Sequence, residues 1–334
     1  MSSESRTIRP TPRWVHVWAI LTVFFTLCAL VLGGMVTTYR VGMADPVWPT
    51  TPWFLFFTSW SEPRRGFLIE HGHRLAGWIL GGVAIVLTVG MWRTARGSMR
   101  WLGLACAIAI GIQASLGGVR VIKNALVGTE FAAIHGIFGQ IVFSLVFSTA
   151  VLTARSSRRD IPTTDREQCQ WQAIVLTMLV FMQLVWGSLV RHSPTVFFQK
   201  MHLMTAFAVV GAAIWLVRTA HSSTASWQRL GRACIILCLF LVLQVILGVE
   251  AWMGKFATGV LPELQLITDE MVIVRTGHVL IGTGILATAV TLVLQTRRIE
   301  PIQELASSSV PPTTEAVQST PAPLAGRHQL GDAS

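Results

Sequence analysis

The sequence predicts an all-α integral membrane protein with eight transmembrane helices. Of its 334 residues, 52% are hydrophobic and 13% are charged, a composition unlike that of soluble domains. The mean hydropathy is +0.58. Apolar runs close to or above the roughly 20 residues that cross a bilayer as a helix recur along the chain. We expect helices over Trp14–Thr38, Phe67–Met91, Trp101–Val119, Phe131–Leu152, Ala173–Val190, Val196–Val217, Ala233–Trp252 and Val272–Leu294.

The distribution of basic residues predicts the orientation of these helices. One set of alternate helix ends carries 16 of the 26 Lys and Arg residues, and the other set carries 10. Short cytoplasmic loops of membrane proteins are enriched in Lys and Arg, so both termini are expected in the cytoplasm. The expected location of the protein is the inner (cytoplasmic) membrane of the cell. The net charge of +10 is scattered over these loops, which argues against nucleic acid as the partner.

The eight predicted helices divide into two groups of four, which we interpret as duplicated four-helix bundles related by a pseudo-twofold axis along the membrane normal. Four crossings return the chain to the same side, so the two groups share an orientation. The Trp- and Pro-rich outer loop 39–66 is too apolar for a solvated linker, and the tail lacks apolar periodicity. The predicted segments are a cytoplasmic N-terminal segment 1–13, a first bundle 14–153, a cytoplasmic linker 154–172, a second bundle 173–295 and a disordered cytoplasmic tail 296–334.

An internal repeat runs through the helices. Each even helix carries one histidine roughly 10 Å below its outer end, at 1.5 Å per residue. A small residue follows each histidine four positions later, and the odd helices carry Gln and Gly at the same four-residue spacing. The histidines and small residues are His73 and Gly77, His135 and Gly139, His202 and Ala206, and His278 and Gly282. The odd-helix pairs are Gln113 and Gly117, Gln183 and Gly187, and Gln244 and Gly248, with Ala29 and Gly33 in the first helix.

Histidines at one membrane depth on neighbouring helices are suited to ligate haem iron from both sides of the porphyrin. The sequence therefore predicts two haem sites near the outer surface, with iron ligated by His73 and His135 and by His202 and His278. The small residues would leave room for the flat macrocycle. Candidate donors to haem propionates are Arg74, Arg120, Arg191 and Arg275, with Lys123, Lys200 and Lys255 as weaker candidates. The alternative is that the histidines, like the glutamines, form hydrogen bonds between helices.

One carboxylate distinguishes the two predicted sites. Glu70 lies one turn before His73, whereas the matching positions hold Ala132, Gln199 and Arg275. A carboxylate beside one haem suggests proton transfer during chemistry at that haem. The alternative is an ion pair with Arg74 that stabilises the start of the helix. His71 and His192 are interpreted as interfacial, and their roles stay open.

With these residues in place, the chain resembles the haem A synthase family. The stretch Glu70-His71-Gly72-His73-Arg74 is similar to the family's Glu-x-x-His-Arg motif, and Asp45-Pro46-Val47-Trp48-Pro49 is similar to a loop of the family. Many bacterial members have a cysteine pair around this loop, where this chain has Ala44 and Thr50 or Thr51. The chain thus resembles a cysteine-lacking member.

The resemblance implies oxidation of the C8 methyl group of haem O to the formyl group of haem A, for haem-copper oxidases. It implies that His73 and His135 flank haem O, that Glu70 serves the reaction, and that His202 and His278 hold a haem b that relays electrons. Haem O synthase and oxidase assembly factors are the expected partners, beside an unknown electron donor. An alternative is a quinol-linked di-haem b cytochrome that only transfers electrons, and a third is a transporter with histidine proton relays.

Overall fold

The computed structural model describes residues 11–44, 48, 65–127, 130–154, 163–193 and 195–297. Most of the predicted N-terminal segment, residues 45–47 and 49–64 of the outer loop, residues 155–162 of the linker and the tail from residue 298 lie outside the described residues. The described helices are α1 (Arg13–Tyr39), α3 (Arg65–Thr94), α4 (Ser98–Val127), α5 (Glu130–Thr153), α6 (Thr163–His192), α7 (Val196–His221), α8 (Thr224–Phe256), the short 3-10 helix η1 (Pro262–Leu264) and α9 (Asp269–Arg297).

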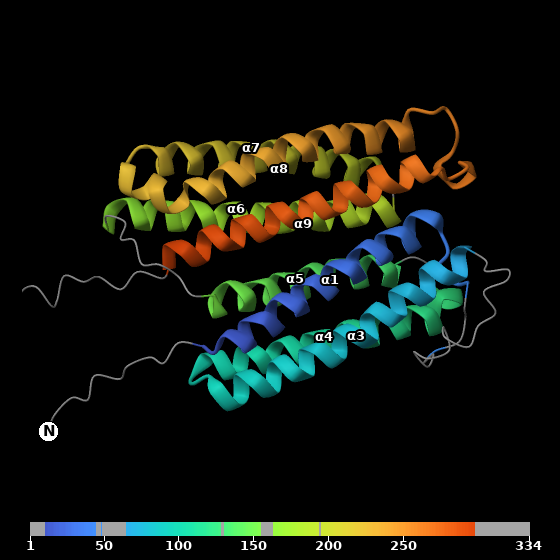
Figure 1. Ribbon diagram of the computed structural model, residues 1–334. Helices are drawn as coiled ribbons and strands as arrows, with labels where there is room; N and C mark the ends of the chain where they lie inside the picture. Colours follow the sequence, from blue (N-terminus) through green and yellow to red (C-terminus); the bar gives the residue numbers. More distant parts are fainter. Residues whose placement is uncertain are drawn as a thin grey trace, which may run out of the picture. The chain divides into compact units, whose positions relative to one another are not determined.

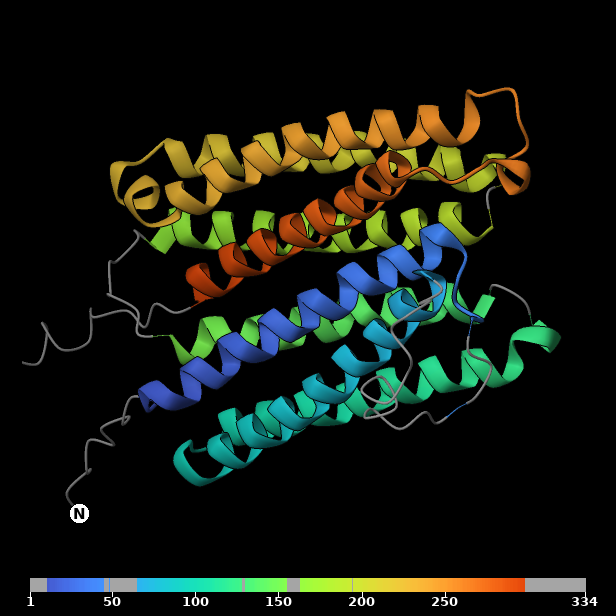
Figure 2. The ribbon, with the colours of Figure 1, turned by 45° about the vertical axis from the view of Figure 1, so that its right-hand side comes forward.

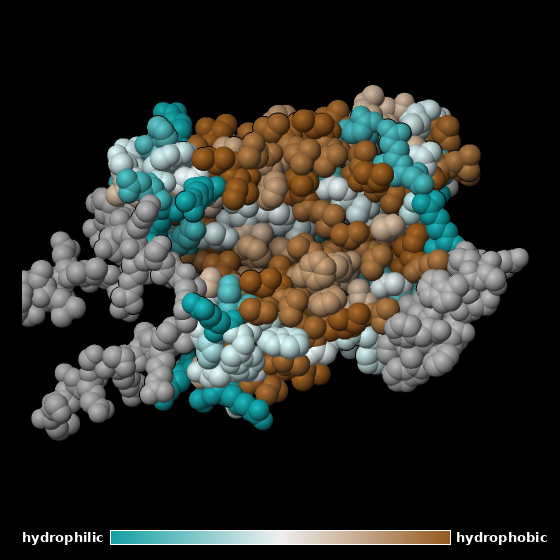
Figure 3. Space-filling view, viewed as in Figure 1, coloured by the Kyte–Doolittle hydropathy of each residue, from teal (hydrophilic) through white to brown (hydrophobic). Residues whose placement is uncertain are grey.

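Eight of the described helices are long and apolar enough to cross a membrane, which confirms the predicted spans. Many large apolar side chains on them are exposed, as expected for a surface that faces lipid. In the space-filling view, apolar residues cover the middle of the helices and hydrophilic residues lie toward their two ends (Figure 3). The chain is therefore a multi-pass membrane protein.

The helices extend beyond the apolar runs that predict them. α6 begins at Thr163 instead of near Ala173, so the last part of the predicted linker 154–172 is helical. α8 likewise begins at Thr224, where the hydroxyl oxygen of the N-cap Ser223 accepts a hydrogen bond from the backbone N–H of Ser226. Hydropathy marks the part of a helix that lies in lipid, whereas charged residues such as Arg229 continue the same helix outside it.

The helices form two groups of four neighbours. α1 packs on α3, α3 on α4, α4 on α5, and α5 on α1; α6, α7, α8 and α9 close a second ring in the same order. The rings meet where α1 and α5 of the first contact α9 of the second, and where α5 contacts α6 (Figures 1 and 2). Buried leucines fill the second ring, among them Leu176, Leu216, Leu230, Leu237 and Leu292.

Small and polar residues mediate the contact between the rings. The Thr283 hydroxyl of α9 donates a hydrogen bond to Oε1 of Gln140 on α5 at 3.0 Å, and both side chains are buried. The Ser188 hydroxyl of α6 donates to the carbonyl oxygen of Ala133 on α5 at 3.3 Å. Close approach through small residues and interhelical hydrogen bonds is typical of helix association in lipid.

Candidate functional site

The structure brings the four predicted histidines together in two pairs. The ring centroids of His73 on α3 and His135 on α5 lie 6.2 Å apart, with an interplanar angle of 88°. Those of His202 on α7 and His278 on α9 also lie 6.2 Å apart, at 67°. The two rings of helices therefore present imidazole pairs of matching separation, one pair in each ring.

Each imidazole lies directly against a glycine of the preceding helix in the chain. A Cβ added to any of these glycines would lie 2.9–3.1 Å from the imidazole Cε1, which is closer than almost all real Cβ contacts. A side chain at these positions would therefore displace the ring. The contacts are Gly33 with His73, Gly117 with His135, Gly187 with His202, and Gly248 with His278.

Main-chain carbonyl groups fix the orientation of two of the rings. Nδ1 of His73 lies 3.0 Å from the carbonyl oxygen of Ala29, and Nδ1 of His202 lies 3.2 Å from that of Gln183. Each carbonyl precedes the contacting glycine by four residues. The corresponding Nδ1 atoms of His135 and His278 are buried without a hydrogen bond within the described part of the chain. Donation from Nδ1 to a carbonyl leaves Nε2 with a free lone pair, the usual arrangement of a histidine that ligates a metal.

Three of the four Nε2 atoms also face a glutamine amide. The side-chain nitrogens of Gln113, Gln183 and Gln244 lie 3.4, 3.3 and 3.2 Å from Nε2 of His135, His202 and His278, respectively. The glutamines thus form hydrogen bonds between helices, as predicted. Their Oε1 atoms are buried and have no hydrogen bond among the described residues.

A buried ion pair lies beside His73. Nη2 of Arg74 donates a hydrogen bond to Oε1 of Glu70 at 2.8 Å, and the two side chains are 8% and 4% exposed. The ion pair with Arg74, which the sequence left open as the alternative role of Glu70, therefore forms. Glu70 can still have a second role beside this ion pair. Arg120 of α4 interacts electrostatically with both charges, and its guanidinium group lies against Gly42. This first site thus combines two histidines with one carboxylate and two arginines.

The cations of the second site bind main-chain groups. Nη2 of Arg191 donates to the carbonyl oxygen of Gly34 at 2.7 Å and to the Thr38 hydroxyl at 2.6 Å, so this α6 side chain reaches α1 of the other ring. Arg275 donates to the carbonyl oxygen of Gly254 at 3.0 Å. The weaker candidate Lys255 donates to the carbonyl oxygen of Val190 at 3.0 Å, whereas Lys123 and Lys200 are exposed.

Two further histidines differ in their surroundings. His71 is only 2% exposed and stacks on Phe67 with ring centroids 3.8 Å apart, so its side chain is enclosed by protein. It points away from His73 because residues two apart face different sides of a helix. His192 lies within electrostatic range of Arg191, Arg120 and Lys255.

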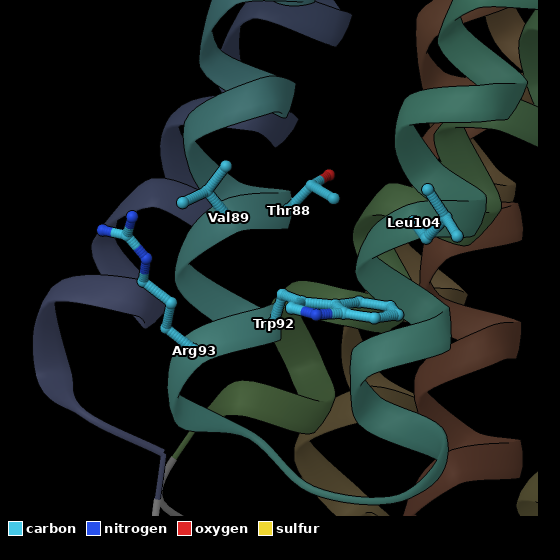
Figure 4. A pocket seen from close by; sticks show the side chains of 5 residues that line it. All are labelled: Thr88, Val89, Trp92, Arg93 and Leu104. Atoms are coloured by element: carbon cyan, nitrogen blue, oxygen red, sulfur yellow. The ribbon is translucent and has the colours of Figure 1, made fainter.

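A separate pocket lies far from the histidines. Its cavity volume is about 290 Å³, and its lining residues are Thr88, Val89, Trp92, Arg93 and Leu104. Trp92 extends from α3 toward the helix that carries Leu104 (Figure 4). Thr88 is 15 residues from His73, or about 22 Å along the helix. The pocket therefore belongs to the opposite end of α3 from the candidate site.

The glycines of the odd helices were visible in the sequence, but their contact with the histidines was not predicted. The sequence had suggested space for a macrocycle beside the small residue that follows each histidine. Gly139 and Gly282 contact the amides of Gln113 and Gln244, whereas the space beside Gly77 is open within 4 Å. The constant four-residue spacing between Gln and Gly was the sequence pattern that could have indicated the contact between these glycines and the histidines.

Among the described residues, no cluster of three or more His, Cys, Asp or Glu side chains is arranged around a common metal position. The candidate site instead brings two histidines together at each of its two positions.

A search of curated proteins found no match. A family model described as cytochrome oxidase assembly protein (COX15-CtaA) matches residues 57–199, which include His73, His135, Glu70 and both arginines of the first site. Over residues 57–199, the resemblance to the haem A synthase family that the sequence predicts is thereby confirmed.

Proposed function

We propose that this protein is a membrane haem A synthase, which oxidises the C8 methyl group of haem O to a formyl group. In this reaction the methyl group and one water molecule together become the formyl group and release four protons and four electrons, and the electrons pass to an external electron acceptor. In this proposal the first site binds haem O and the second holds a haem b that relays electrons. The observation that carries the proposal is the pair of matched histidine sites, of which, among the described residues, only the first has a buried carboxylate beside it.

The separation of the histidines would allow the two rings of each pair to hold one haem iron. With a metal–nitrogen bond of about 2.0 Å to each ring, an iron would fit between imidazoles whose centroids lie about 6 Å apart. Both pairs have this separation. The carbonyl partners of His73 and His202 hold Nδ1 as the donor, which leaves Nε2 for iron.

When bound, the haem supplies the redox chemistry of its iron, and the protein orients the porphyrin and handles protons. Glu70 is the group placed to accept a proton at Oε1 beside His73. Arg74 keeps that oxygen in position through the 2.8 Å hydrogen bond. Arg120 and Arg74 provide positive charge for the propionates of haem O, and Arg191 and Arg275 provide it for haem b.

The proposal extends to the architecture and the setting of the protein. Gene duplication explains why each histidine contacts a glycine in the same way. It also explains two rings of helices related by a pseudo-twofold axis along the membrane normal. Both termini are proposed to lie in the cytoplasm, with the sites near the outer surface of the inner membrane. Haem O synthase would supply the substrate, and oxidase assembly factors would receive haem A.

The first test removes the carboxylate. Glu70→Ala is expected to abolish haem A formation in cells that make haem O, because no other described acidic side chain replaces it at this position. The haem b of the second site should remain. Gln199→Ala changes the matching position of the second ring and should leave haem A formation within about twofold of the unchanged protein, since exposed or uncharged replacements cost little. The readout is mass spectrometry of extracted haems.

One outcome would contradict the role of Glu70, and another would contradict the proposed haem A synthase function. Full haem A output from Glu70→Ala would remove Glu70 from the mechanism. A purified protein that holds haem b at both sites, with no haem O or haem A in any preparation, would instead support the di-haem electron-transfer cytochrome.

A further inference from the structure

Arg191 connects the second ring of helices to the backbone beside the first site. Nη2 of Arg191 on α6 donates to the carbonyl oxygen of Gly34 at 2.7 Å and to the Thr38 hydroxyl at 2.6 Å. The Thr38 hydroxyl itself donates to the same carbonyl oxygen at 2.9 Å. Gly34 and Thr38 are both buried on α1, so a cation of the second ring is bonded to a buried turn of the first ring.

This turn of α1 lies between the two histidine sites. A Cβ added to Gly33 would lie 3.0 Å from Cε1 of His73. A Cβ added to the next residue, Gly34, would lie 2.9 Å from Cγ2 of Thr276. Thr276 belongs to α9 and precedes His278 by two residues. The adjacent glycines therefore allow α1 to approach His73 on one side and α9 of the second ring on the other.

The two adjacent glycines also make this turn of α1 depend on its hydrogen bonds. Glycine loses more conformational freedom on folding than any other residue, so two in succession weaken the helix at this point. The bond from the Arg191 guanidinium to the Gly34 carbonyl is charge-assisted, and such bonds are roughly twice as strong as those between neutral groups. We therefore expect Arg191 to fix the backbone against which the imidazole of His73 lies.

The guanidinium group of Arg191 retains donors for a second partner. Nη2 carries two of its five N–H donors, and the two bonds to α1 use both of them. The charge of Arg191 acts on His278, and within the described part of the chain no carboxylate pairs with it. Arg191 can therefore bind a propionate of the second-site haem through Nε or Nη1 and keep its bonds to α1.

We propose that Arg191 is a positioning residue for the first haem site, although it belongs to the second ring. Its bonds to Gly34 and Thr38 fix one turn of α1. The imidazole of His73, which lies against Gly33 of this turn, is thereby held in one orientation. This inference rests on the proposed binding of haem at the two sites, and it makes haem binding at the first site depend on a cation of the second.

The first test compares haem O binding at the first site in full-length variants purified with their haem b. Thr38→Val removes one acceptor of Arg191 and should weaken this binding about fivefold or more, the lower end of typical couplings between sites. Thr26→Val is the matched control, because Thr26 is also buried on α1 and its hydroxyl donates within the helix. Thr26 lies 12 residues from Thr38, or about 18 Å along the helix, so its replacement should leave the affinity unchanged.

A second comparison changes the cation itself. Arg191→Met removes both bonds to α1 and should weaken haem O binding at least as much as Thr38→Val. The double variant should bind haem O no more weakly than Arg191→Met alone, because the bond that the two residues share is already lost. Arg275→Met removes the other cation of the second site, which donates to Gly254 within the second ring. It should therefore change the second-site haem without weakening haem O binding at the first.

The orientation of the imidazoles provides a readout that separates positioning from folding. The electron paramagnetic resonance signal of a low-spin ferric haem depends on the angle between its two imidazole planes. The first-site signal should therefore shift in Thr38→Val and stay unchanged in Thr26→Val. A lower protein yield of Thr38→Val with an unchanged signal and affinity would give Thr38 a role in folding alone and overturn the inference.

The outcomes also separate this inference from the proposed function. Equal haem O affinity and equal first-site signals in Thr38→Val and Thr26→Val would overturn the positioning role, even if Arg191→Met does not fold. Equal loss of haem O binding in Arg191→Met and Arg275→Met would overturn it as well, since only Arg191 bonds α1. Failure of the unchanged protein to bind haem O would instead contradict the proposed function, on which the inference rests.

Discussion

At the scale of single residues, each of the four histidine rings contacts the backbone of a neighbouring helix, and three of them also contact a glutamine side chain. Each ring lies on a glycine, and two rings also bond the carbonyl group four residues earlier. A glycine inside a helix costs up to about 1 kcal/mol relative to alanine, so its presence at each contact needs a reason. The reason is the space that the imidazole requires.

Replacement of one such glycine should affect haem binding more than folding. In Gly248→Ala, the new Cβ would lie 2.9 Å from Cε1 of His278, so the ring must shift by a few tenths of an ångström. We expect loss or weakening of the second-site haem, measured by its redox difference spectrum. Gly254→Ala on the same helix, where an added Cβ meets nothing within 4 Å, is the matched control and should keep this haem. Equal spectra for the two variants would refute the packing role of Gly248.

At the scale of helices, hydropathy predicted the number and order of the spans but not their ends or contacts. It located α6 because residues from Ala173 onward are apolar, and it missed the polar first turns from Thr163 because they lie outside the apolar run. The pairing of His73 with His135 followed from their matched depth. The contact between Gly33 and His73 could not be predicted, since it depends on the distance and rotation between α1 and α3.

The contact between α5 and α9 includes a hydrogen bond that can be tested. Thr283→Val removes the hydroxyl that donates to Gln140, so the Oε1 atom of Gln140 loses this hydrogen bond. We expect a loss of about 0.6–1.7 kcal/mol in the free energy of unfolding, the range measured for such bonds between membrane helices. Unfolding in mixed detergent micelles provides the measurement.

Thr288→Val is the control for this prediction. The Thr288 hydroxyl donates to the carbonyl oxygen of Gly284 in its own helix, and the residue is also buried. Its replacement should cost less than that of Thr283. If the two replacements have the same effect, the hydrogen bond across the rings contributes nothing beyond burial of a threonine.

At the scale of the whole molecule, the two rings are chemically unequal although their histidines are equally spaced. The first ring has the Glu70–Arg74 pair, and the second has Arg191, which bonds α1 of the first ring. Cation positions were predictable from sequence because few charges occur within the spans. The partners of these cations were not predictable, since Arg191 bonds the carbonyl oxygen of Gly34 and the hydroxyl of Thr38, and no sequence pattern links these residues to Arg191.

The proposed orientation of the whole molecule has a direct test. Because 16 of the 26 basic residues lie at one set of helix ends, that side should face the cytoplasm. Green fluorescent protein fused after Ser334 should fluoresce, and alkaline phosphatase inserted at Gly259, between α8 and η1, should be active. Phosphatase activity at Ser334 together with a silent insertion at Gly259 would reverse the assigned topology.

The glycine seats have a practical consequence for anyone who engineers this protein. A common route to greater heat resistance exchanges helical glycines for alanines, since each exchange restricts the unfolded chain. Applied here without regard to location, that strategy would also change the four glycines that contact the histidines, and it is expected to yield a more heat-resistant protein without its proposed haem.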